Sequence, residues 1–155
     1  MNYDVWGPWS LYVGSNAPLD DSCAAPAYRE GSAVSAVKAW SDAGIPVNQI
    51  VLGVAAYGHT FSVPSYDAFP NNTQTLAAYP PFNASNYPLG DGGAGGPDVC
   101  GIIENPGGTF TFKGLIESGF LTTDGKPGSG IYYRFNDCSK TVEWPRYLDV
   151  IVSLI

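Results

Sequence analysis

Basic side chains are scarce in this sequence of 155 residues. Seven Lys and Arg stand against fourteen Asp and Glu, which gives a formal net charge of −7. A protein that binds nucleic acid needs a basic face that displaces counterions from phosphates. The charge balance therefore argues against any polyanionic partner, and we expect no nucleic-acid binding.

Long apolar runs and clustered metal ligands are also missing. No stretch of about 18 or more apolar residues occurs, so we expect no membrane span and no membrane partner. One histidine, His59, and three cysteines without a C-x-x-C or Cys-His cluster argue against a zinc site. We expect no metal and no cofactor. The length suits one ordinary domain.

Aromatic residues, in contrast, are abundant. The sequence has ten Tyr, seven Phe and four Trp. Their flat faces and polar tips suit a neutral, hydroxyl-rich ligand such as a sugar, but they are equally typical of a hydrophobic core. Composition alone favours the core interpretation.

Two N-glycosylation triplets lie in turn-rich segments, at residues 71–73 and 83–85. Together with the cysteines they favour a secretory origin. Met1 is followed directly by Asn2, Tyr3 and Asp4, not by the basic region and apolar stretch of a signal peptide. We therefore expect an extracellular, secreted parent protein whose N-terminus is missing from this chain.

The clearest helix signal covers Ser32–Ala43. Apolar residues recur at helical spacing through Val37 and Trp40, which predicts that Trp40 lies in the core. Gly44 supplies a left-handed residue after the helix, and Pro46 prevents its continuation. The continuous apolar run Gln49–Tyr57 then predicts a strand buried on both faces of a parallel sheet. Strand, helix and strand together indicate a βαβ unit of an α/β protein.

The texture changes after Tyr57, where Pro, Gly, Asn and Tyr become frequent. Short strands are expected at Thr109–Phe112 and Gly130–Phe135, with a short helix at Lys113–Ser118. This pattern indicates a small antiparallel α+β module. The glycines of Gly90–Pro97 follow no strand and open no helix, so they predict a flexible loop and no phosphate site.

Four segments resemble glycoside hydrolase family 18, the chitinases, in order along the chain. Residues 1–9 read MNYDVWGPW, similar to the sixth barrel strand of that family with its M-x-Y-D and G-x-W elements. Residues 53–58, GVAAYG, resemble the seventh strand. Residues 98–101, DVCG, and 133–138, YRFNDC, resemble the α+β insertion of the fungal-type members. The chain is thereby identified as similar to a C-terminal fragment of such an enzyme, over roughly residues 1–141.

The resemblance implies an α/β fold class, with part of a TIM (β/α)8 barrel and an insertion domain. Residues 1–60 would form the sixth and seventh strands with the helix between them, 61–141 the insertion and 142–155 an atypical tail. A whole barrel needs about 250 residues and at least about 200, so this chain cannot close one alone.

The resemblance also implies a set of sugar-binding residues. The hydroxyl of Tyr3 would meet the N-acetyl oxygen and stabilise the cyclised intermediate, a catalytic role. Substrate-binding roles are implied for a Met at the pocket floor, an Asp on the distorted sugar, an aromatic platform and two groove-lining tyrosines: Met1, Asp4, Trp9, Tyr57 and Tyr133. His59 occupies a position that is often Arg in related enzymes, and it has no nucleophile to serve as a base.

Family 18 enzymes hydrolyse the β-1,4-N-acetylglucosamine linkages of chitin with the substrate's own N-acetyl group as nucleophile. Their acid is the Glu that ends a D-x-x-D-x-D-x-E motif, in which the alternating Asp residues share one face with that Glu. This sequence contains no such motif. We expect a chitinase parent and an inactive isolated chain whose partners are chitin, N-acetylglucosamine oligomers or the missing remainder of the barrel. The alternatives are a non-catalytic chitin-binding protein and a product without function.

The cysteines and the last residues leave choices open. Cys100 and Cys138 flank the insertion, and we expect them to pair, which would stabilise the fold by about 3–4 kcal/mol on a chain-entropy basis. Cys23 is then the odd cysteine, although a pairing through Cys23 is the alternative. After residue 141 the resemblance fades, and Trp144 does not match the eighth-strand Trp of the family. Residues 142–155 are expected to be a frame-altered tail, or else a strand that covers an open sheet edge.

Overall fold

The structure is a computed structural model that describes residues 1–72, 75–85, 90–91, 96–97, 100–101, 103–104, 108–129, 134–136, 139, 141–146 and 150–154. It is a small α/β chain built on one antiparallel five-stranded sheet in the order β4-β1-β7-β6-β5. The strands are β1 (Tyr57–Ser62), β4 (Thr109–Thr111), β5 (Arg134–Asn136), β6 (Thr141–Arg146) and β7 (Val150–Leu154). A separate short pair joins β2 (Gly96–Pro97) to β3 (Ile103–Glu104).

The helices are short apart from α1 (Ala33–Asp42). The others are α2 (Ser65–Ala68) and α3 (Phe112–Glu117), with single 3₁₀ turns η1 (Pro26–Tyr28), η2 (Val47–Gln49) and η3 (Pro70–Asn72). The predicted strand over Thr109–Phe112 and the short helix after it are therefore confirmed as β4 and α3, with bounds shifted by about one residue.

Helix α1 confirms the prediction for Ser32–Ala43. The Ser32 hydroxyl accepts from the backbone N–H of Ser35 at 3.2 Å, and the Ser35 hydroxyl accepts from the N–H of Ser32 at 2.8 Å. This reciprocal capping box satisfies two donors that the first helical turn leaves without partners. Gly44 follows at φ 96°, the left-handed residue that the sequence predicted.

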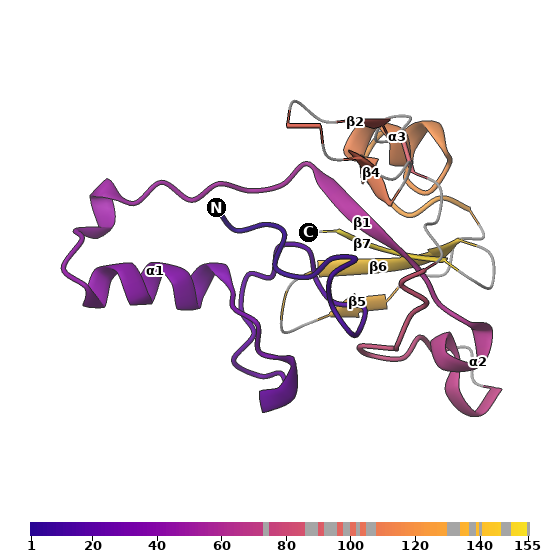
Figure 1. Cartoon of the computed structure of the whole chain (residues 1–155), viewed down its shortest axis with the longest axis horizontal. Helices are drawn as coiled ribbons and strands as arrows, with labels where there is room; N and C mark the ends of the chain where they lie inside the picture. Colours follow the sequence, from indigo (N-terminus) through magenta and orange to yellow (C-terminus); the bar gives the residue numbers. More distant parts are fainter. Residues whose placement is uncertain are drawn as a thin grey trace.

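The predicted burial of α1 is wrong. Trp40 is 61% exposed and Val34 is 51% exposed, and Ala33 alone is buried in the helix. Figure 1 shows α1 and the segment that follows it projecting away from the sheet. The apolar spacing was read correctly, but no described element packs against that face of the helix.

The strand predicted over Gln49–Tyr57 is also wrong in its bounds. Its start lies in η2, and β1 begins at Tyr57, where the predicted strand ends. Between them the chain forms one parallel bridge, Asn2 with Val54, and Val51 is 91% exposed. A strand inside a sheet needs a hydrogen-bonded neighbour at each edge, and among the described residues 51–55 have one such neighbour, Asn2.

Strand β1 is flanked on both edges. It pairs antiparallel with β4, from Tyr57 opposite Thr111, and with β7, from His59 opposite Ser153. Residues 142–155, expected as an atypical tail, thus supply most of β6 and all of β7. Of the two alternatives for this segment, a strand that covers a sheet edge agrees with the structure. The antiparallel character predicted for the second half of the chain is confirmed.

Two small apolar clusters flank the sheet. Phe61 of β1 packs with Val13, Val63, Ala68 and Leu76. A second cluster joins β4 to α3 and the turn after it, through Phe110, Leu115, Phe120 and Leu121. Residues 58–62 of β1 are therefore buried, whereas Tyr57 at its start is half-buried.

The cysteine prediction needs correction. Cys23, expected to be the odd cysteine, is disulfide-bonded, whereas Cys100 carries an exposed thiol. The expected pairing of Cys100 with Cys138 is therefore wrong as regards Cys100. Cys138 lies outside the described residues, as do residues 130–133, 92–95 and Thr73.

Removing the capping hydroxyl by Ser32→Ala should destabilise α1 by about 1 kcal/mol. Amide hydrogen exchange within the helix is the appropriate measurement, because α1 is largely exposed. Ser41→Ala is the matched control. The Ser41 hydroxyl is buried in the same helix without a hydrogen-bond partner in the described structure, so its loss should leave exchange nearly unchanged. Equal effects of the two substitutions would show that the cap contributes nothing specific.

Candidate functional site

A fully buried asparagine joins three chain segments near the start of β1. Asn16 is 0% exposed. Its side-chain oxygen accepts from the N–H of Asp4 at 2.9 Å, and its side-chain amide donates to the carbonyl of Tyr57 at 2.8 Å. Its own carbonyl accepts from Val5 at 3.1 Å. These bonds fix the position of residue 4 relative to residue 57.

Asp4 has a left-handed backbone at φ 57°. This region is uncommon outside glycine, although Asp adopts it more readily than most residues. The conformation turns the carboxylate toward β1, where its Oδ1 accepts from the Tyr57 hydroxyl at 2.6 Å and lies 2.9 Å from Nε2 of His59. A carboxylate only accepts hydrogen bonds, so Nε2 is the donor. Residues 4, 57 and 59 thus form one polar cluster.

The Tyr57 hydroxyl acts in this cluster as a donor. Burial, and then the hydrogen bond to Asp4, raise the pKa of Tyr57 well above its usual range. The phenol therefore stays protonated through neutral pH and keeps donating to the carboxylate.

His59 is 7% exposed and connects the carboxylate to an aromatic surface. Its ring meets that of Trp9 at a centroid distance of 5.3 Å and an interplanar angle of 79°. In the described part of the chain, Nδ1 of His59 has no hydrogen-bond partner. The ring therefore has one polar contact, to Asp4, and otherwise supports Trp9 by an edge contact of the kind that aromatic pairs favour.

Trp9 is 62% exposed, and a glycine sets the position of its ring. A Cβ added at Gly7 would overlap the six-membered ring of Trp9, so the indole lies directly against the backbone of residue 7. The G-x-W element of the sequence thus has a physical cause. Glycine at the first position lets the tryptophan two residues later lie flat over the chain.

Tyr3 lies beside the cluster and completes its aromatic edge. Its ring meets that of Tyr57 at 6.1 Å and 67°, and its hydroxyl donates to the sulfur of Met1 at 2.7 Å. Met1, expected at the floor of a pocket, is 91% exposed. No described residue encloses its side chain.

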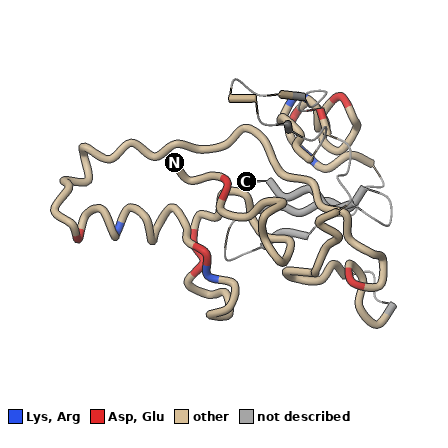
Figure 2. Tube along the Cα trace, viewed as in Figure 1, with Lys and Arg blue, Asp and Glu red and all other residues tan. Residues whose placement is uncertain are grey.

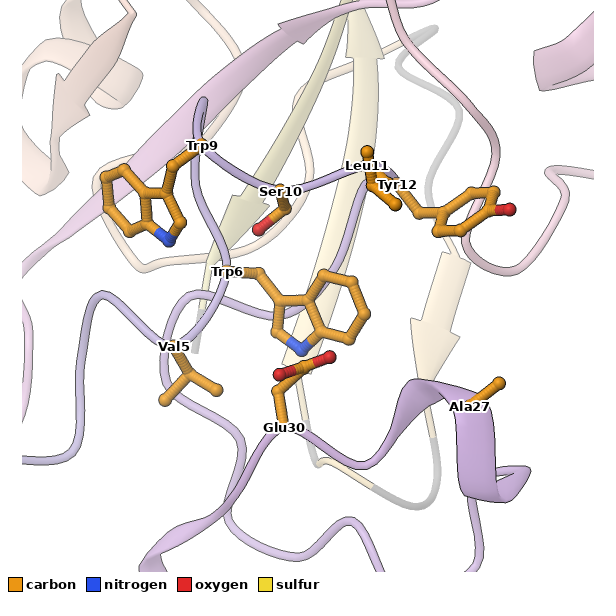
Figure 3. Close-up of a pocket in the computed structure, with 8 residues that line it drawn as sticks. All are labelled: Val5, Trp6, Trp9, Ser10, Leu11, Tyr12, Ala27 and Glu30. Carbon is orange, nitrogen blue, oxygen red and sulfur yellow. The ribbon is translucent and has the colours of Figure 1, made fainter.

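A cavity of about 300 Å³ is lined in part by Trp9. Figure 3 shows the eight residues that line it: Val5, Trp6, Trp9, Ser10, Leu11, Tyr12, Ala27 and Glu30. Trp6 is 4% exposed and lies over Gly14, where an added Cβ would overlap the indole. Glu30 is the only charged residue in the lining.

Of the six sugar-binding residues implied by the resemblance, the structure brings four together: Tyr3, Asp4, Trp9 and Tyr57. Met1 touches Tyr3 but is open to solvent, and Tyr133 lies outside the described residues. Three further residues were missed. No motif marked Asn16, His59 was considered only as a position that is often Arg and as a base without a nucleophile, and Gly7 was noted only as part of a motif.

The described residues show two further features. No helix among them is long and apolar enough to cross a membrane, and no three of their His, Cys, Asp and Glu side chains are gathered around a possible metal position. Figure 2 shows the Lys and Arg residues of the described trace lying apart from one another.

Comparison with known proteins places these features in context. No protein-family model matches the chain. It is 56% identical over 144 residues to a chitinase-like effector of Moniliophthora roreri, which covers 91% of this chain and 35% of that protein. A chitinase-like effector of Moniliophthora perniciosa is 55% identical over 141 residues, covering 90% of this chain and 32% of that protein. The chain spans about a third of the length of these relatives.

Solved structures agree with the sequence relatives. The chitinase of Rhizomucor miehei superposes with a TM-score of 0.75 at 29% identity, over 99% of this chain and 40% of that one. A family 18 chitinase of Cycas revoluta, solved in complex with (GlcNAc)4, has a TM-score of 0.65 at 16% identity and matches 99% of this chain and 33% of that one.

In sequence, the chain therefore resembles a segment of the chitinase-like relatives. In fold, it resembles a segment of a family 18 chitinase.

Asn16→Ala should destabilise the fold by about 1–3 kcal/mol, because it removes the partners of the Asp4 N–H and the Tyr57 carbonyl, which are part-buried. Urea denaturation followed by tyrosine and tryptophan fluorescence measures the change. Asn48→Ala, at an exposed position of η2, is the matched control and should shift stability by less than about 0.5 kcal/mol. Similar losses in both variants would contradict the role given to Asn16.

Gly7→Ala should displace the Trp9 ring with little loss of stability, since the new methyl group competes with an exposed side chain. The near-ultraviolet circular dichroism and the fluorescence maximum of Trp9 should change, whereas the unfolding midpoint should stay close to that of the unchanged chain. Gly31→Ala is the wrong control because φ there is 119°. Gly53→Ala is suitable, since the nearest atom lies 3.4 Å from the added Cβ.

Proposed function

We propose that this chain binds β-1,4-linked N-acetylglucosamine oligomers, the building units of chitin, at the cluster of Tyr3, Asp4, Trp9 and Tyr57. The observation that carries the proposal is that an exposed tryptophan, Trp9, and a carboxylate held in place by hydrogen bonds, Asp4, both contact His59. Trp9 offers a flat apolar face of the kind on which a sugar ring stacks. Asp4 offers an acceptor for its hydroxyl or amide groups.

The hydrogen bonds of Asp4 support a ligand-binding role. Oδ1 already accepts from Tyr57 and is met by His59. In the described structure Oδ2 carries no protein donor, and the side chain is 43% exposed. One oxygen thus anchors the carboxylate and the other faces solvent. A preorganised polar group of this kind binds with a smaller ordering cost than a flexible surface carboxylate.

The comparisons support the same ligand class. The relatives are chitinase-like by name, and structural neighbours were solved with GlcNAc oligomers bound. We also propose that residues 1–60 correspond to the sixth and seventh strands of a family 18 barrel, and residues 61–141 to its α+β insertion.

We further propose that the chain on its own does not hydrolyse the oligomer. The sequence contains no D-x-x-D-x-D-x-E motif, and the described cluster holds one carboxylate, Asp4, with no second acid beside it. Hydrolysis of the substrate-assisted type requires a protonated carboxyl group next to the leaving oxygen. A chitinase activity of a longer parent, with this segment as part of its cleft and a secreted location, is the second candidate, which the resemblance to the chitinase of Rhizomucor miehei favours.

Trp9→Ala should abolish measurable binding of (GlcNAc)4, because the stacking surface is lost. Isothermal titration calorimetry with the whole chain measures the affinity. The sequence offers a closely matched control in Trp40→Ala, since Trp40 is 61% exposed against 62% for Trp9 and lies on α1. Trp40→Ala should leave the affinity unchanged. Equal losses in both variants would mean that the oligomer adsorbs to exposed aromatics in general.

Hydrolysis is tested separately with the same preparation. Incubation of purified chain with (GlcNAc)4 should leave the tetramer intact. Release of GlcNAc or (GlcNAc)2 would overturn the proposal that the chain binds the oligomer without cutting it, provided that the activity co-purifies with the chain and is absent from Asp4→Asn.

A further inference from the structure

We propose that the cavity beside Trp9 is a separate subsite for a sugar unit with a free amine, so that the chain prefers an oligomer in which one end unit is glucosamine rather than N-acetylglucosamine. This inference rests on the proposed function, because it assumes that the neighbouring units of the same oligomer occupy the cluster around Asp4. It goes beyond that function in assigning a different chemical preference to a different part of the surface.

The size of the cavity suits one sugar unit. Its volume of about 300 Å³ is at the lower end of the range of about 300–1,000 Å³ typical of small-molecule sites. Trp9 lines this cavity and also contacts His59 on its other edge. An oligomer that stacks on Trp9 would therefore place a unit at the mouth of the cavity.

The charge of the lining decides the preference. Glu30 is the only ionisable carboxylate among the eight lining residues, and no Lys, Arg or His is among them. In the described part of the chain no cation lies within ion-pair distance of Glu30. In the view of Figure 3 its carboxylate points toward the indole of Trp6. The cavity thus combines one uncompensated negative charge with two tryptophan rings.

An ammonium group matches this lining better than an acetamide does. It offers three hydrogen-bond donors to a carboxylate that only accepts, against one donor from the amide of an N-acetyl group. It is also attracted to the faces of tryptophan rings by the cation–π interaction. The acetyl group would have to fit its methyl and carbonyl beside the carboxylate, where the carbonyl oxygen and Glu30 repel each other.

The test compares three tetramers at about pH 6, where the amine of glucosamine is protonated. They are (GlcNAc)4 and the two variants that carry a single glucosamine, at the reducing or at the non-reducing end. Because the cavity lies on one side of Trp9 only, we expect one of the two deacetylated tetramers to bind more tightly than (GlcNAc)4. The gain should be about two- to fivefold, the range of a partly exposed ion pair.

Two charge-removing variants separate the cavity from the overall negative charge of the chain. Glu30→Gln should abolish the preference for the glucosamine-bearing tetramer, and it should not weaken the binding of (GlcNAc)4, because it removes the repulsion between the carboxylate and the acetyl oxygen. Glu117→Gln removes the same charge from α3, where the carboxylate is paired with Lys113 at 3.4 Å, and should keep the preference. Both side chains are exposed, so neither variant should impair folding, and an unchanged unfolding midpoint verifies this.

The outcomes distinguish this inference from the proposed function. Equal affinities of all three tetramers, with binding still lost in Trp9→Ala, would overturn the amine subsite and leave chitin-oligomer binding intact. A preference that Glu30→Gln and Glu117→Gln reduce equally would assign it to net charge and would also overturn the subsite. Absence of binding by every tetramer would overturn both.

Discussion

The side chain of Asn16 is the constraint on which the site depends. It is fully buried, and it holds the N–H of Asp4 with its oxygen and the carbonyl of Tyr57 with its amide. An uncharged amide can accept with its oxygen and donate with its nitrogen at the same time. Through this residue the first segment of the chain is attached to the start of β1, and the carboxylate of Asp4 is brought within reach of Tyr57 and His59. The left-handed backbone of residue 4 persists because bonds on either side of it fix its direction.

The polar cluster and the aromatic platform are coupled through His59. Its Nε2 contacts Asp4, while its ring supports Trp9 at 5.3 Å. The indole in turn lies against Gly7. The indole of Trp9 on which a ligand would stack is therefore held by the buried ring of His59 and by the backbone of Gly7. Trp9 also lines the cavity that contains Glu30. Asp4 is held by two neighbours, whereas no described cation lies within ion-pair distance of Glu30.

Predictions from the sequence succeeded where neighbouring residues determine the structure. They failed where the structure depends on whether a distant segment packs against the residue. The helix that starts near Ser32, the left-handed Gly44 and the helix after Thr111 were predicted because short-range hydrogen bonds and backbone preferences determine them. The burial of Trp40 and the strand through Val51 were wrong, because apolar spacing tells which face seeks a partner and not whether one is present. The motif around Tyr3, Asp4 and Trp9 located the site through its resemblance to a family. Asn16 and His59 carry no such mark, since a buried Asn or a supporting His is recognisable only by its distant contacts.

The placement of β7 has a consequence for how the chain is made. β1 lies between β4 and β7, and its partner residues in β7, such as Ser153 opposite His59, are encoded far downstream. During synthesis the edge of β1 that faces β7 therefore remains open while the intervening residues leave the ribosome. An extended strand with unsatisfied hydrogen-bonding groups is a template for association with another chain, and pairings between distant residues form slowly. Yield in a heterologous host should thus respond to translation speed and to chaperone supply more strongly than the modest size of the chain would suggest.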